Sequence, residues 1–137
     1  MRFSIIETPD YLADAKEIGL TDDDRKTIVD VLSFDPQAGV IIPGTGGARK
    51  IRFPGRGKGK SGGYRVITYY GGDDIPLFLL NVFAKGDKVD LSTAERRQLR
   101  IALASLADDY RKGVGRYVEG GRTHPPQRRA RPGIRSR

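Results

Sequence analysis

Residues 75–84 read IPLFLLNVFA, a nearly continuous apolar run. A strand with apolar side chains at successive positions is one that is covered on both faces, as in the middle of a sheet. We therefore expect residues 75–84 to form the core strand of a small sheet. The neighbouring segments indicate what is built around it.

Two further strands are predicted before this run, joined by a glycine-rich turn. Residues 48–53, ARKIRF, place Lys50 and Arg52 on one side and apolar residues on the other, the period of a half-buried strand whose basic side faces water. Residues 64–70, YRVITYY, have the β-branched and aromatic side chains typical of a strand. Residues 54–63 then form the turn between them.

The remaining segments predict one more strand and three helices. Residues 2–7 favour a first strand. Apolar residues at helical spacing predict a helix over 11–18, and a second helix begins at Thr21, a good N-cap. Residues 92–95, STAE, match a capping box that opens a third helix, which we expect to end near residues 112–113.

These segments predict one α+β domain over residues 1–112. The order is strand, two helices, three strands, helix, in a small and mostly antiparallel sheet with the helices packed on one side. Residues 113–137 contain seven arginines and one acidic residue, with little apolar content. Such a segment cannot repay the entropy of folding, so we expect an arginine-rich, disordered tail.

Composition excludes several classes of function. The 137 residues include no cysteine, and the one histidine, His124, lies among prolines and arginines. Disulfides are excluded, and we expect no metal site and no small-molecule cofactor. No apolar run reaches the roughly 20 residues that span a bilayer, and the first residues lack a secretory signal, so a cytoplasmic protein without membrane contact is expected.

Charge is distributed unevenly along the chain, whose formal net charge is +8. Residues 1–37 contain four basic and nine acidic side chains, whereas residues 38–72 contain seven basic and none acidic. Cationic side chains beside a glycine-rich turn form a surface that phosphates can approach closely. The expected partner is a polyanion, most simply RNA.

Two motifs carry a family resemblance. Residues 49–70, RKIRFPGRGKGKSGGYRVITYY, are followed by residues 77–99, LFLLNVFAKGDKVDLSTAERRQL. In this order they resemble the RelE/HigB-type toxins of bacterial type II toxin–antitoxin systems, over roughly residues 1–110. The resemblance implies a RelE-like α+β fold and a toxin that enters the ribosomal A site, contacts ribosomal RNA and cleaves mRNA. It also implies a cognate antitoxin that neutralises the toxin.

Metal-independent RNA cleavage needs a base for the 2′-hydroxyl, a phosphate clamp and a proton donor. Because no histidine is patterned, lysines crowded by other cations are the candidates for proton transfer, namely Lys58 and Lys60. Arg65 matches the phosphate-clamping arginine of the family, and a guanidinium fork suits two phosphate oxygens. Lys85 and Lys88 fall where the family places a second cationic group.

Four other basic residues are interpreted as RNA-binding contacts that position phosphates: Arg49, Lys50, Arg52 and Arg56. The sequence departs from the best-known ribosome-dependent members near Leu91 or Ser92, where they have a tyrosine that can stack on a base. Alternation along the strand places Tyr64 on the face opposite Arg65, so Tyr64 is a poor substitute.

The leading hypothesis is a toxin that acts as an mRNA interferase, an endoribonuclease that blocks translation on the ribosome. Two alternatives stay open. The wider RelE/ParE superfamily includes gyrase-poisoning members of the same fold, so a non-catalytic inhibitor of gyrase is the first. A simple RNA-binding module is the second, because the basic tail alone could hold RNA.

Overall fold

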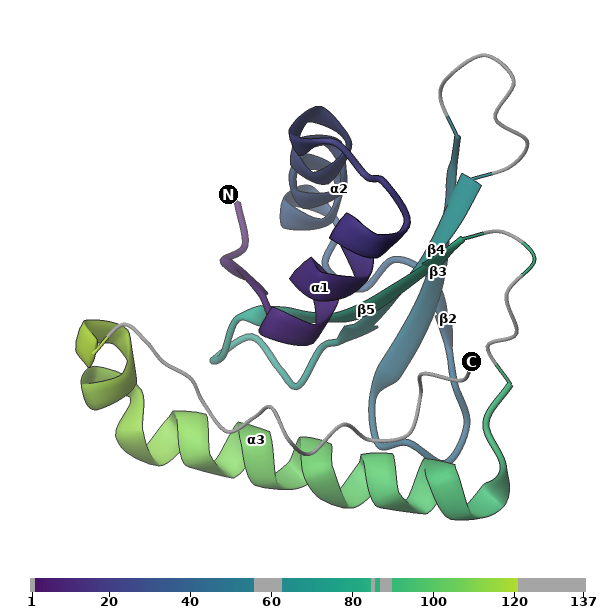
Figure 1. Cartoon of the computed structure of the whole chain (residues 1–137). Helices are drawn as coiled ribbons and strands as arrows, with labels where there is room; N and C mark the ends of the chain where they lie inside the picture. Colours follow the sequence, from purple (N-terminus) through teal and green to yellow (C-terminus); the bar gives the residue numbers. More distant parts are fainter. Residues whose placement is uncertain (1, 56–62, 85, 87–89, 121–137) are drawn as a thin grey trace.

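The computed structural model describes residues 2–55, 63–84, 86 and 90–120 (Figure 1). Five strands and three helices follow one another in these parts of the chain. Their bounds are β1 Ile5–Glu7, α1 Pro9–Glu17, α2 Asp22–Phe34, β2 Val40–Ile41, β3 Ala48–Pro54, β4 Gly63–Tyr69, β5 Leu77–Ala84 and α3 Thr93–Gly120.

The five strands form one sheet in the order β1-β5-β4-β3-β2. Strand β1 pairs with β5 in parallel, and the other three pairs are antiparallel. Every residue of β5 from Leu77 to Phe83 is buried. The mixed α+β fold and the core strand predicted from the sequence are therefore confirmed.

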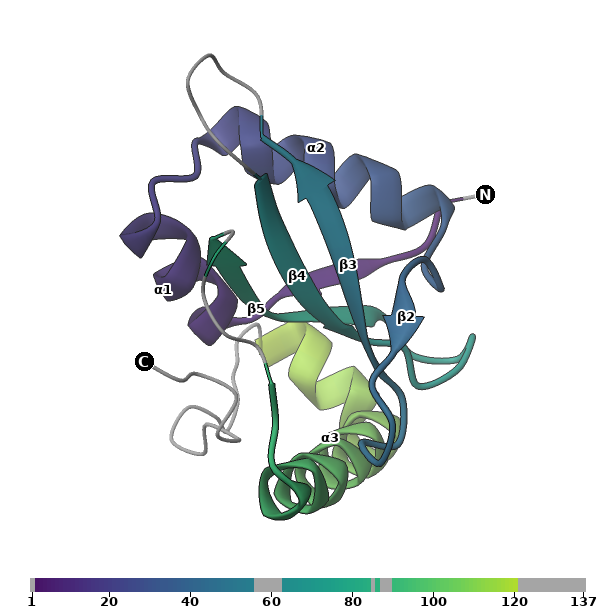
Figure 2. The same ribbon diagram turned by 90° about the vertical axis from the view of Figure 1, so that its right-hand side faces the viewer.

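The helices cover both faces of the sheet. On one face α1 and α2 pack over a core that includes Tyr11, Leu32 and Val66. On the other face α3 packs over a second core, which includes Ile67 and Leu99, and Figures 1 and 2 show the sheet lying between the two helical layers. The prediction that the helices pack on one side is wrong, because the apolar side chains of β5 point alternately to each face and both sets need cover.

One strand was not predicted. Val40–Ile41 forms the short edge strand β2, in which Val40 pairs with Lys50 and Ile41 with Arg49. The order therefore contains four strands between α2 and α3, one more than expected. Two residues are too few to show the alternation by which a strand is recognised.

Both predicted capping sites are present. The Thr21 side chain accepts from the backbone N–H of Asp24, and the Asp24 carboxylate accepts from the N–H of Thr21. At α3 the N–H of Ser92 donates to Glu95 Oε1 over 2.8 Å, and the N–H of Glu95 donates to Ser92 Oγ over 3.1 Å. These bonds satisfy backbone donors that a helix start leaves unpaired.

Helix α3 does not end where the sequence predicts. It continues to Gly120, but Gly113 departs from helical geometry, with φ −113° and ψ 24°. The residue at the predicted end is thus a break within a longer helical segment. Residues 121–137 of the predicted tail lie outside the described residues, so their disorder stays a prediction.

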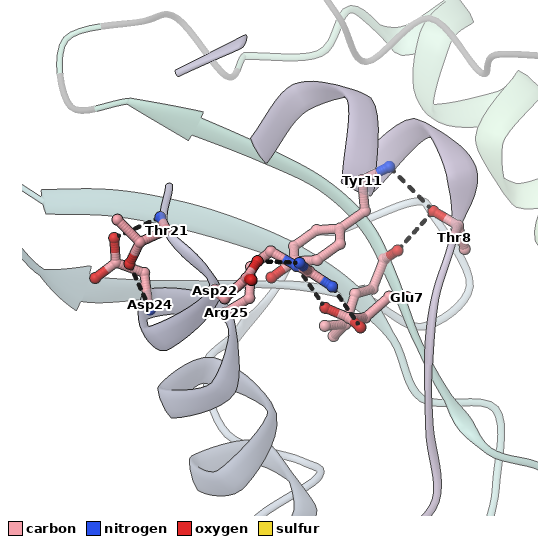
Figure 3. Close-up of polar contacts among 8 residues, drawn as sticks. Glu7, Thr8, Tyr11, Thr21, Asp22, Asp24 and Arg25 are labelled. Atoms are coloured by element: carbon pink, nitrogen blue, oxygen red, sulfur yellow. Dashed lines mark hydrogen bonds and ion pairs between the residues drawn. The ribbon is translucent and has the colours of Figure 1, made fainter. Parts of the chain in front are cut away.

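In the acidic N-terminal part of the chain, Arg25 forms ion pairs with neighbouring carboxylates. The Arg25 guanidinium on α2 binds both carboxylate oxygens of Glu7 on β1, at 3.0 and 3.1 Å, and also contacts Asp22 at 3.1 Å (Figure 3). Tyr11 lies beside this group with no exposed surface. The ion pairs join β1 to α2 and leave Arg25 unavailable to a ligand.

A second arginine ties α3 to the turn before β5. Arg111 Nε contacts Asp74 Oδ2 at 2.6 Å, and Nη2 contacts Asp74 Oδ1 at 3.0 Å and the carbonyl oxygen of Gly71 at 2.8 Å. The hydrogen bond from Arg111 lowers the pKa of the Asp74 carboxyl. A carboxyl whose pKa is lowered by folding stabilises the fold above its unfolded pKa and loses this effect as pH falls through the folded value.

We therefore expect Asp74→Asn to lower the melting temperature at pH 7, because the charged acceptor of Arg111 is lost. The difference from the unmodified protein should shrink as the pH falls below the ordinary aspartate range and through the lowered pKa of Asp74, where this carboxyl becomes protonated in the folded protein. Thermal melts between pH 2.5 and 7 measure this, with the exposed α3 variant Asp109→Asn as the control. A difference that stays constant with pH would contradict the expectation.

Candidate functional site

The predicted site residues divide into two groups. Arg56, Lys58 and Lys60, between β3 and β4, lie outside the described residues, as do Lys85 and Lys88 after β5. Their predicted roles stay predictions. Four described residues remain, and these define what the structure brings together: Arg65, Arg49, Lys50 and Arg52.

Alternation along β3 and β4 decides which face each basic side chain occupies. On β3, Ala48 belongs to the core under α3, whereas Ile51 and Phe53 pack into the core under α1 and α2. Lys50 and Arg52 therefore share the α3 face with Ala48. On β4, Val66 lies under α1 and α2, so the preceding residue, Arg65, projects to the α3 face as well.

Arg52 and Arg65 occupy directly opposite positions on these two strands. Directly opposite side chains have Cβ atoms about 4.5–5.5 Å apart, and two like charges in such a pair destabilise a sheet. Arg65 is in turn opposite Phe83 of β5, a residue that is 7% exposed. The α3 face therefore presents two arginines and a phenylalanine in one row across three strands.

Two basic residues on this face, Lys50 and Arg52, have no acidic partner among the residues that the structure describes. Elsewhere in the described residues, cations form ion pairs: Arg2 and Lys26 with Asp30, Arg25 with Glu7, Arg111 with Asp74, and Lys112 with Asp108. Within the same residues, no carboxylate pairs with Lys50 or Arg52. Uncompensated positive charge is thus concentrated on the α3 face of β3, where it can attract an anion.

Arg49 is separated from this surface. Its guanidinium carbon lies 5.6 Å from the centre of the Tyr70 ring, and Tyr70 packs against Phe3, with ring centres 5.8 Å apart. Tyr70 also donates a short hydrogen bond to Asp73, which raises the pKa of the Tyr70 hydroxyl. Arg49 therefore lies with the aromatic residues on the α1/α2 side and does not join Lys50 and Arg52.

The aromatic residues near the site have structural roles. Tyr64 stacks on Phe53, with ring centres 6.5 Å apart, on the face opposite Arg65, as alternation predicts. Leu91 is buried in the core under α3, and Ser92 caps the helix. The position at which the sequence resemblance leads one to look for a base-stacking tyrosine is thus used here for packing and capping.

A buried carboxylate that the sequence reasoning missed fixes the strand beside the site. Asp14 on α1 is 3% exposed, and its Oδ2 accepts from Asn81 Nδ2 at 2.9 Å and from the N–H of Val82 at 3.3 Å. The pairing of β4 with β5 shifts register at this point, between Ile67 and Thr68. A β-bulge of this kind re-aims the side chains that follow it. Along β5, the register shift precedes the position at which Phe83 lies opposite Arg65.

The described residues contain no group of three histidine, cysteine, aspartate or glutamate side chains that could hold a metal ion. Within the same parts of the chain, no helix is both long enough and apolar enough to span a membrane.

The repulsion between Arg52 and Arg65 gives a testable effect on stability. We expect Arg52→Gln to raise the free energy of unfolding by about 0.5 kcal/mol, because it removes one of two directly opposed charges. Urea unfolding measures the effect, and the exposed α3 variant Arg97→Gln serves as the control. If Arg52→Gln instead lowered the free energy of unfolding, Arg52 would be a residue that stabilises the fold.

Comparison with known proteins supports the fold. No family model matches the sequence. Among solved structures, the E. coli toxin RelE, a double arginine-to-alanine mutant in the free state, is similar with a TM-score of 0.50 and 15% sequence identity. The alignment covers 75% of this chain and 98% of that toxin. At this identity the likeness shows a shared RelE-like fold, which confirms the fold expected from the sequence.

Proposed function

We propose that this protein is the toxin of a toxin–antitoxin pair and cleaves mRNA on the ribosome. The single observation that carries the proposal is the pair of directly opposed arginines, Arg52 and Arg65, on a face that also presents Lys50, for which the described residues provide no acidic partner. A sheet tolerates such repulsion at a site whose ligand is an anion. The RelE-like fold supports the choice of messenger RNA as that anion.

In this proposal Arg65 binds the phosphate at the cut. A guanidinium can donate two parallel hydrogen bonds to phosphate oxygens and can stabilise the charge that develops on them. Arg65 is on a strand paired along both edges, so its backbone is held between β3 and β5. Arg52 then binds the same or the adjoining phosphate, and Lys50 contributes a further cationic contact along β3.

The proton transfers are assigned to lysines. Attack by the 2′-hydroxyl needs a base, and the departing oxygen needs an acid. Lys58 and Lys60 lie between Arg52 and Arg65 in the sequence, and Lys85 and Lys88 follow β5, the strand that pairs with the strand of Arg65. Arg56 would add an RNA-binding contact beside Lys58. The reaction as proposed needs no metal ion.

The ribosome and an antitoxin complete the proposal. Ribosomal RNA supplies further phosphates for the basic surface, and the ribosome presents the messenger in a fixed conformation. A cognate antitoxin would cover the α3 face of β3 and β4. Acidic side chains of the antitoxin would complement Lys50 and Arg52 and would speed association. Co-purification of the full chain with the product of a neighbouring reading frame tests this part.

The main experiment compares three substrates for the purified full chain. The proposal predicts cleavage of a messenger on translating ribosomes, much slower cleavage of the same messenger alone, and no trapped DNA breaks when gyrase acts on supercoiled plasmid. Gyrase-dependent DNA breaks with an intact messenger would instead favour the gyrase inhibitor. Tight RNA binding without either effect would favour a simple RNA-binding module.

A further inference from the structure

The loop between β2 and β3 has a fixed shape that no part of the proposed cleavage uses. It contains residues 43–47, PGTGG, and connects Ile42 to Ala48. Thr45 is fully buried; its hydroxyl donates to the carbonyl oxygen of Ile42 over 2.7 Å and accepts from the N–H of Ala48 over 3.1 Å. The two hydrogen bonds of this buried hydroxyl fix the conformation of the loop.

The φ angles of this loop alternate in sign over residues 44–46, as they do in an anion-binding nest, before Gly47 repeats a positive φ of +130°. Gly44 has φ +81° and Gly46 has φ +77°. No described residue other than glycine has a positive φ, so the φ of Thr45, between these two glycines, is negative. Consecutive residues with φ of alternating sign turn their N–H groups toward a common point, where an anion can accept from them. In the described parts of the chain, no acceptor pairs with the N–H groups of residues 44–47.

Two arginines of α3 lie against the same loop. A Cβ added to Gly44 would be 3.6 Å from Cδ of Arg96, and one added to Gly46 would be 3.1 Å from Cγ of Arg100. Arg96 Nη1 donates to the carbonyl oxygen of Pro43 over 3.3 Å, whereas its buried Nε has no acceptor. No carboxylate in the described residues pairs with Arg100. The aliphatic stems of both arginines and the guanidinium group of Arg96 therefore lie against the loop whose N–H groups have no acceptor in the described residues.

We propose that residues 43–47 together with Arg96 and Arg100 form a phosphate-binding site, here called the phosphate nest. Nests take tetrahedral oxyanions, and guanidinium forks bind phosphate oxygens in pairs. The glycines let the side chains of Arg96 and Arg100 lie close against the loop backbone. A carboxylate peptide would use the arginines equally well but would gain less from the nest.

The position of the phosphate nest identifies the phosphate as one of an RNA backbone, an identification that rests on the proposed function. Strand β3 begins directly after the loop and presents Lys50 and then Arg52 on the face that α3 covers. RNA bound at Arg52 and Arg65 can therefore continue along β3 toward Arg100. The phosphate nest would hold the RNA at a second point, away from the bond that is cut.

The first test is an NMR titration of the full chain with inorganic phosphate. The backbone N–H signals of Gly44 and Gly46 should shift in a saturable way, since these groups are the proposed donors. The shifts should weaken at least fivefold in Arg100→Gln and persist in Lys112→Gln, which removes a charge on the same helix from an exposed ion pair. Glycine signals that do not move, or that move equally in Arg100→Gln, would overturn the site.

A second variant separates the loop from the arginines. Gly46→Ala keeps both guanidinium groups but places a Cβ at φ +77°, a conformation that side-chain-bearing residues rarely adopt, against Arg100. We expect it to lose the saturable shift at Gly44 as well. Retention of that shift would show that the backbone nest does not bind the phosphate.

The RNA arm measures affinity for a single-stranded RNA at several salt concentrations. Loss of one phosphate contact in Arg100→Gln should reduce the slope of log K against log salt by about 0.7, and Lys112→Gln should leave it unchanged. An unchanged slope in Arg100→Gln together with the phosphate-dependent shifts would overturn RNA as the ligand and leave a site for free phosphate. Neither arm depends on RNA cleavage, so a failure of the proposed function would leave these results interpretable.

Discussion

Arg65→Ala should reduce the rate of messenger cleavage on the ribosome by about 10²–10³-fold, the loss expected when one donor to a developing anionic charge is removed. The side chain projects from a strand end toward the α3 face and is not a member of either core. The variant should therefore stay folded, and single-turnover cleavage of messenger bound to ribosomes measures the effect on chemistry.

Two companion variants make this result specific. Arg65→Lys keeps the positive charge but cannot form the bidentate contact, so its rate should fall between those of Arg65→Ala and the unmodified protein. Lys112→Ala removes a cation that is already paired with Asp108 on α3, and its rate should not change. Equal rates for Arg65→Ala and the unmodified protein would rule out Arg65 as the phosphate clamp.

Asp14→Leu should lower the free energy of unfolding by about 3 kcal/mol, the largest effect on stability that we expect. Leucine fills a similar volume but leaves two buried donors, Asn81 Nδ2 and the N–H of Val82, without their acceptor. An unsatisfied buried donor costs about 1–3 kcal/mol. For a domain of this size, the melting temperature should fall by more than about 10 °C.

The matched control for this prediction is Asp14→Asn. Both donors bind the same carboxylate oxygen, Oδ2, so an amide oxygen in that place can still accept from them. Asp14→Asn should therefore be far less destabilised than Asp14→Leu in thermal and urea unfolding. If the two variants were equally stable, the hydrogen bonds to β5 would not be what Asp14 contributes.

The sequence was sufficient to predict the core of the fold. Apolar continuity identified β5 as the core strand, and the capping pairs at Thr21 and Ser92 identified the starts of α2 and α3. These features are local, because each depends on residues within a few positions of one another. Strand β2, with only Val40 and Ile41, was too short to give such a signal.

The placement of helices could not be predicted in the same way. Periodicity shows which side of a helix is buried, but it does not show which face of the sheet that helix covers. The burial of β5 on both faces did imply two layers of cover, and that implication contradicted the expectation of helices on one side. Gly113 illustrates a related limit, since a glycine that breaks helical geometry need not end the helical segment.

The candidate site was predicted in part. Strand alternation correctly placed Arg65 away from Tyr64, and the same rule applied to β3 separates Arg49 from Lys50 and Arg52. Arg49, Lys50 and Arg52 were predicted to be one set of RNA-binding contacts because they share a positive charge, and charge does not show which face of the sheet a side chain occupies. The opposition of Arg52 and Arg65 depends on the pairing register, which is set by contacts between distant segments.

Asp14 had a signal that could have been used. It falls three residues after Tyr11 and one before Ala15, so a carboxylate lies among the apolar side chains that α1 buries. A buried carboxylate requires hydrogen-bond donors from another element. That requirement predicts a polar partner such as Asn81 within the otherwise apolar β5, although the distance between the two in sequence leaves the pairing to the tertiary structure.

The most direct test of the central claim maps the ends of a cleaved messenger on ribosomes stalled in two reading frames. The same RNA sequence is presented twice, with the start codon moved by one nucleotide in the second template. If the protein cuts the messenger that the ribosome holds, the cut moves by one nucleotide with the frame. A cut that stays at the same nucleotide in both frames, or the absence of any cut, would contradict a ribosome-dependent nuclease.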